Sequence, residues 1–164
     1  MSPDPQALQH AAELVEQLEG LGATVVPVLG VRDLADPAAS AQLVDAALGR
    51  FGRLDAAVAA SGRIVTGSFL KSSLDDLQTV VRGCLEAPYH FLRAVVPPMV
   101  QAGAGQVLVI TSASAARPTP GAPLYSSARA AATMLAKNVA AEVAHNGVQV
   151  NAVGTNYMDF PEFR

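Results

Sequence analysis

Apolar runs alternate with helix-like periodicities along the chain. Short apolar runs predict strands at 54–60, 106–113 and 148–154. The middle run is the strongest of the three, because it is continuous and rich in β-branched residues. The run 23–29 is a further candidate strand. Pro27 places it at a sheet edge, since proline donates no hydrogen bond to a neighbouring strand.

Segments with apolar residues at helical spacing lie between these runs. The spacing predicts helices over 5–20 and 126–144, and a third that begins after the Asp-Pro pair at 36–37. The long stretch 72–103 predicts two helices, or one helix kinked at Pro88. Strands that alternate with helices indicate βαβ units, so we expect one α/β domain over residues 1–164 with a mostly parallel sheet.

Composition excludes several classes of protein. Of the 164 residues, 51% are hydrophobic, which is enough for a core and unlike a disordered chain. With 11 basic and 14 acidic residues, the chain lacks the strongly basic character of a nucleic-acid-binding protein. Cys84 is the only cysteine, and the three histidines have no metal-ligand spacing, so we expect neither a disulfide framework nor a metal site. No apolar run is long enough for a membrane span and no secretory signal opens the sequence, which predicts a cytoplasmic protein.

Three residues near the strongest strand suggest chemistry. Ser112 lies where that strand opens into a loop, and Tyr125 and Arg129 lie four residues apart at the start of the next helix. Residues at this spacing share a helix face, and ligands of parallel α/β sheets bind beyond the carboxyl ends of the strands. A fixed cation beside a phenol favours the phenolate, so Tyr125 would serve as a base. The spacing alone nevertheless favours structural roles, with Arg129 on a solvated face.

The sequence around these residues resembles that of the short-chain dehydrogenase/reductase superfamily. The resemblance lies in ITSASAARPTPGAPLYSSARAAATMLAKNVAAEVAHNGVQVNAVG, in RFGRLDAAVAASG (50–62) and in RAVVPPM (93–99). It implies a Rossmann-like, doubly wound parallel sheet in a three-layer αβα arrangement. The long helical stretch 72–103 and the Ala-rich helix 126–144 resemble the helices that pair subunits in this superfamily. They imply a homo-oligomer, either a dimer or a tetramer.

The departures from the superfamily pattern point to one branch. Arg129 replaces the usual lysine, Cys84 replaces an asparagine of the reductases' proton relay, and Thr155-Asn156 replaces a Pro-Gly pair. YSSAR (125–129) together with GTNYMDF (154–160) resembles the halohydrin dehalogenases, which use Ser, Tyr and Arg.

That resemblance implies a lyase that needs neither a redox cofactor nor a metal. Tyr125 would deprotonate a vicinal halo-alcohol oriented by Ser112, and the alkoxide would close to an epoxide with loss of halide. In reverse, small anions would open epoxides. The resemblance implies a pocket for the halide and substrate beside four residues: Thr155, Asn156, Tyr157 and Phe160. The alternatives are a divergent oxidoreductase that uses NAD or NADP, and a truncated inactive member.

The length bears on this interpretation. The superfamily's glycine-rich turn after its first strand has no match in the sequence. We therefore expect a partial fold that lacks the first and last strands. In the strand order 3-2-1-4-5-6, the missing first strand separates the third from the fourth.

Overall fold

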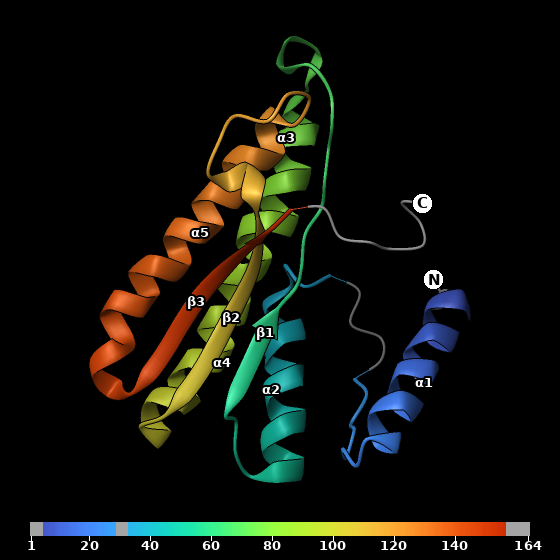
Figure 1. The fold of residues 1–164 in the computed structure, drawn as a ribbon, viewed down its shortest axis with the longest axis vertical. Helices are drawn as coiled ribbons and strands as arrows, with labels where there is room; N and C mark the ends of the chain where they lie inside the picture. Colours follow the sequence, from blue (N-terminus) through green and yellow to red (C-terminus); the bar gives the residue numbers. More distant parts are fainter. Residues whose placement is uncertain (1–4, 29–32, 157–164) are drawn as a thin grey trace.

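The sheet consists of three parallel strands in chain order. The computed structural model describes residues 5–28 and 33–156. Its strands are β1 (Ala56–Ala59), β2 (Gly105–Ser112) and β3 (Val148–Thr155), and β2 lies between the other two. With helices joining these parallel strands, the predicted α/β, Rossmann-like fold class is confirmed (Figure 1).

Five α-helices accompany the sheet: α1 (Pro5–Gly20), α2 (Pro37–Phe51), α3 (Leu74–Val81), α4 (Ala87–Ala102) and α5 (Pro123–Val143). The long helical stretch is divided by a π-helical turn, η2 (Arg82–Glu86), which ends just before Pro88. The described residues also contain three short 3₁₀ helices: η1 (Phe69–Lys71), η3 (Ala113–Ala115) and η4 (Ala144–Asn146).

Local sequence determines where α2 and α3 begin. The Asp36 carboxylate accepts a hydrogen bond from the Ala38 N–H at 2.9 Å, and Pro37 occupies the first helical position. Ser73 and Asp76 form a reciprocal capping box at the start of α3. These caps define where the two helices begin.

The helices α2, α4 and α5 pack against one face of the sheet (Figure 1). Strand residues alternate between this buried face and the opposite one. Val58 and Val153, which belong to the opposite face, are 58% and 45% exposed. The core between sheet and helices is built by Val107, Val109, Val148 and Val150 from the strands and by Leu92, Val95, Met99, Ala136 and Val143 from the helices.

The strand predicted at 23–29 is not formed within the described part of that run, residues 23–28. The described residues offer it no neighbouring strand, and Pro27 further lowers its capacity for ladder hydrogen bonds. The preceding helix α1 stands apart from the other helices in Figure 1, and its Leu14 and Leu18 are nearly half exposed. The apolar periodicity thus identified α1 correctly, although this face is only partly covered.

None of the helices in the described ranges combines the length and the apolar character required to cross a membrane. Within the same ranges, histidine, cysteine, aspartate and glutamate side chains nowhere gather in the groups of three or more that bind metal ions.

Candidate active site

The predicted site residues begin at the carboxyl ends of the strands. Ser112 is the last residue of β2, and its partner in the parallel register is Thr155, the last residue of β3. The Thr155 hydroxyl donates to the carbonyl oxygen of Thr111 at 3.3 Å, which ties the two strand ends together. Because the strands are parallel, their carboxyl ends share one edge of the sheet, where βα folds bind ligands.

The Ser112 side chain is held by the turn that follows it. Its oxygen accepts hydrogen bonds from the N–H and the hydroxyl of Ser114, at 3.2 and 2.9 Å. Both contacts use Ser112 as acceptor, so its own proton is left to donate to a ligand.

The structure brings Tyr125 and Arg129 together on α5. The Arg129 Cζ lies 5.2 Å from the centre of the Tyr125 ring, within the range of a cation–π contact. Arg129 is only 8% exposed, so a place on a solvated face is wrong for this residue. Its Nη1 donates to the carbonyl oxygens of Ser61 and Ile110, at 2.9 and 3.1 Å. Arg129 thus reaches the ends of both β1 and β2.

Tyr125 also packs against a small second core, formed by Val80, Cys84 and Ala128. This core joins α5 to α3 and to the π turn. Cys84 is fully buried, as expected for a small structural side chain, and its thiol donates to the carbonyl oxygen of Arg63 at 3.1 Å. The π turn was not predicted, although such turns often occur near functional sites.

The halide-side residues of the prediction are only partly described. Thr155 is half-buried at the strand end, and Asn156 follows it with an exposed side chain. Tyr157 and Phe160 lie outside the described residues, so the predicted halide pocket stays a prediction.

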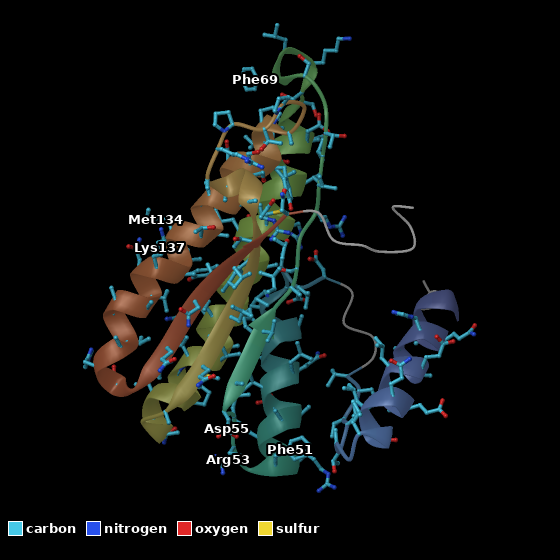
Figure 2. All side chains as sticks on the ribbon, in the orientation of Figure 1. Phe51, Arg53, Asp55, Phe69, Met134 and Lys137 are labelled. Atoms are coloured by element: carbon cyan, nitrogen blue, oxygen red, sulfur yellow. The ribbon has the colours of Figure 1, made fainter. Side chains whose placement is uncertain are left out.

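An open cavity of about 1000 Å³ lies next to the Ser112 turn and the start of α5. Two of its lining residues are close to the predicted catalytic pair. Ser114 is hydrogen-bonded to Ser112, and Ser126 follows Tyr125 in the sequence. Phe69, also in its lining, lies beyond the carboxyl ends of the strands in Figure 2. The two prolines and the glycine of the loop at 116–121 are the sequence signal for this hollow, because such residues favour an irregular loop.

An ion pair outside this cavity links the loop before α2 to the π turn. The Arg82 Nε donates to the Asp33 carboxylate at 2.7 Å. The Ala35 N–H, and then Arg82, lower the pKa of Asp33 below its usual value of 3.8. The pair is largely solvent-exposed, so it fixes the loop more than it stabilises the fold.

Comparison with known proteins identifies the family. A family model described as short chain dehydrogenase matches residues 6–163. The chain belongs to the short-chain dehydrogenase family. An uncharacterised NAD-dependent oxidoreductase of Mycobacterium tuberculosis is 30% identical over 158 residues, which is 96% of this chain and 57% of the relative. The crystal structure of a short-chain dehydrogenase/reductase from Burkholderia xenovorans is 27% identical, with a TM-score of 0.82 over 91% of this chain and 56% of that one.

The chain therefore spans a little over half the length of these members of the short-chain dehydrogenase family. None of the matches named here is a halohydrin dehalogenase. ElxO, solved with NADP bound, shares the fold with a TM-score of 0.76 over 80% of this chain and 53% of its own, at 22% identity. The Mycobacterium relative, at 30% identity, is named for its dependence on NAD. The expectation that no cofactor is needed was therefore wrong, and the comparisons point to a nicotinamide cofactor.

The described residues fit the nicotinamide end of such a cofactor. The Arg129 Nε is a buried donor without a hydrogen-bond partner among them, and the hydroxyl-rich ribose next to nicotinamide would satisfy it. Ser112 and Tyr125 lie at the same end of the strands. The glycine-rich turn that holds the pyrophosphate in this architecture has no counterpart in the printed sequence.

Proposed function

We propose that this chain contributes the catalytic half of a nicotinamide-dependent oxidoreductase acting on an alcohol or its carbonyl product. One observation carries the proposal: the Tyr125 ring rests on a buried Arg129 at the sheet edge where Ser112 ends its strand. A phenol, a fixed cation and a hydroxyl in this order are suited to moving a proton on and off a substrate oxygen.

The roles follow from the chemistry of each side chain. The cofactor, when bound, exchanges a hydride with the substrate carbon. Tyr125 gives a proton to the carbonyl oxygen during reduction and takes it back from the alcohol during oxidation. Ser112 donates a hydrogen bond to the same oxygen, through the proton that its contacts with Ser114 leave available. Arg129 carries only hydrogen-bond donors and lies against the Tyr125 ring, so it holds the phenol in place and does not relay the proton itself.

The substrate would occupy the cavity beside Ser114 and Ser126. Its lining is rich in proline, alanine and serine, with Phe69 on one side, and Arg117 is its only charged residue within 5–28 and 33–156. Such a surface suits a mainly apolar alcohol or ketone rather than a polyanion.

The finer prediction, a halohydrin dehalogenase, has less support. Within the described residues it depends on Arg129 in place of the family's lysine and on Thr155-Asn156 in place of its Pro-Gly pair. The relatives named above are oxidoreductases or proteins of the reductase family. Release of halide from vicinal halo-alcohols is accordingly the competing outcome of the functional assay.

The assay has two readouts. Calorimetric titration with NADH and NADPH measures cofactor binding, and the loss of reduced cofactor is then followed with a panel of aldehydes and ketones. We expect Tyr125→Phe to lower turnover by about 10²–10⁴-fold while cofactor binding is retained. Tyr89→Phe, a change at a 45% exposed position on α4, is the matched control and should leave turnover unchanged.

Wild-type turnover in Tyr125→Phe would overturn the assignment of the proton donor. Halide release without any binding of NADH or NADPH would instead overturn the oxidoreductase proposal.

A homo-oligomer, dimer or tetramer, is part of the same proposal. A shallow groove of about 160 Å³ separates α4 from α5 and is lined by apolar residues that include Leu92, Val96 and Leu135. Helices of this kind pair readily between subunits, and light scattering of the assayed preparation gives the subunit count. A cytoplasmic location is likewise a proposal, consistent with the absence of a membrane-crossing helix among the described residues.

A further inference from the structure

The segment that follows β1 is held from two sides. Arg129 reaches it from α5 and donates to the carbonyl oxygen of Ser61 at 2.9 Å, and Cys84 reaches it from the π turn and donates to that of Arg63 at 3.1 Å. The same Arg129 nitrogen donates to Ile110 of β2 at 3.1 Å. The guanidinium thus bridges the ends of two neighbouring strands, beyond the last register pair of β1.

Glycine at position 62 allows this bridge. A Cβ built on Gly62 would lie 2.9 Å from the Arg129 Cζ and still closer to its Nη2. Real Cβ atoms essentially never approach other atoms this closely, so a side chain at position 62 would force the guanidinium to leave its place between the two strands. Gly83 in the π turn has the corresponding relation to Arg63, whose backbone nitrogen would lie 2.8 Å from an added Cβ.

We propose that Arg129 is a positioning residue that clamps β1 to β2 and supports the Tyr125 ring, with Gly62 as its obligatory steric partner. The guanidinium is planar and rigid, so the hydrogen bonds of Nη1 to the two strand carbonyls also fix the plane on which the ring rests. The ammonium of a lysine could reach a carbonyl but offers no plane to the ring. This proposal depends on the proposed function in one respect: Tyr125, the residue that Arg129 positions, is taken to be the proton donor. The contacts of Arg129 can be tested without measuring turnover.

A double-mutant cycle tests the steric partnership. Gly62→Ala should lower the thermal midpoint of the full chain by roughly 5–10 °C, because the new methyl group displaces the guanidinium. In the background of Arg129→Ala, Gly62→Ala should lower the thermal midpoint only slightly, because the guanidinium that would clash with the new methyl group is absent. Gly49→Ala is the matched control: an added Cβ there meets nothing within 4 Å, and the position is helical, so the midpoint should stay or rise in both backgrounds.

An equal cost of Gly62→Ala in both backgrounds would show that Gly62 and Arg129 are not partners and would overturn the clamp. If Gly62→Ala folds only when Arg129 is removed, the result supports it. Activity has no part in this comparison, so failure of the clamp and failure of the oxidoreductase assignment are separate results.

A spectroscopic measurement tests the support of the Tyr125 ring. Tyrosine is replaced by 3-fluorotyrosine, and the ¹⁹F resonance of Tyr125 is assigned from its loss in Tyr125→Phe. Arg129→Lys keeps the charge but removes the plane, so the Tyr125 resonance should move and broaden while that of Tyr89 stays. Arg50→Lys, at an exposed arginine of α2, should move neither resonance. An unchanged Tyr125 resonance in Arg129→Lys would contradict the positioning role even if none of the Gly62 variants folds.

Discussion

Packing between α4 and the sheet can be tested at Met99. This residue is fully buried, and it lies directly against the first residue of β2: a Cβ on Gly105 would be 2.5 Å from both the Met99 Cγ and Sδ. Met99→Ala removes most of a core side chain that lies directly between α4 and the backbone of β2. Large-to-small changes of this type cost about 2–5 kcal/mol, and we expect about 3 kcal/mol here. For a domain of this size that corresponds to a midpoint lowered by roughly 6–12 °C.

Thermal and urea unfolding followed by circular dichroism measure this loss. Met134→Ala is the matched control, because Met134 is 54% exposed on the outer side of α5 (Figure 2) and should lose less than about 1 kcal/mol. Met99→Leu keeps the volume and should cost less than about 1.5 kcal/mol. If the two alanine variants lose the same stability, α4 does not pack on β2 as described, and the reasoning fails.

Two further predictions concern the start of α2. Because the folded-state pKa of Asp33 is lowered, its charged form stabilises the fold above pH 3.8, and this stabilisation is lost as the pH falls through the lowered value. Asp33→Asn should therefore be slightly less stable than the parent at pH 7 and equally stable in acid, as urea unfolding at a series of pH values will show; a constant difference at every pH would contradict this. Asp36→Ala removes the N-cap of α2 and should cost about 1 kcal/mol in the same assay, whereas Asp36→Ser should restore most of it.

Much of the fold was readable from the sequence because its elements carry local signals. The run 106–113 matches β2 within one residue at each end, and the Asp36-Pro37 pair marks the start of α2 as predicted. The strand predicted for the run 23–29 was wrong over its described part. A strand forms only when a second strand pairs with it, and local hydrophobicity does not show whether that second strand is present. The π turn, which contains the buried Cys84, was missed because no residue type in the sequence marks such a turn.

The site was predicted as a set of residue types and only in part as an arrangement. The spacing of Tyr125 and Arg129 correctly predicted that they share a face of α5. Burial of the guanidinium was not predictable from that spacing, because its hydrogen-bond partners are backbone carbonyls far away in the sequence. Every residue has a backbone carbonyl, so the residue type does not show which carbonyl will accept a hydrogen bond from an arginine. The one trace in the sequence is Gly62, whose missing side chain makes room for the arginine.

The chain-order sheet has a consequence for how the protein folds. In the described part of the chain, strands pair only with their neighbours in the sequence, and in parallel. Every pairing therefore needs a complete helical crossover before its first hydrogen bond can form. Loop closure must therefore precede any gain from the ladder, which places this topology among the slow folders of its size. During that delay the Ala-rich α5 can already be helical, whereas the valine-rich strands remain exposed. Refolding yield should consequently fall with protein concentration well before the stability of the native state changes.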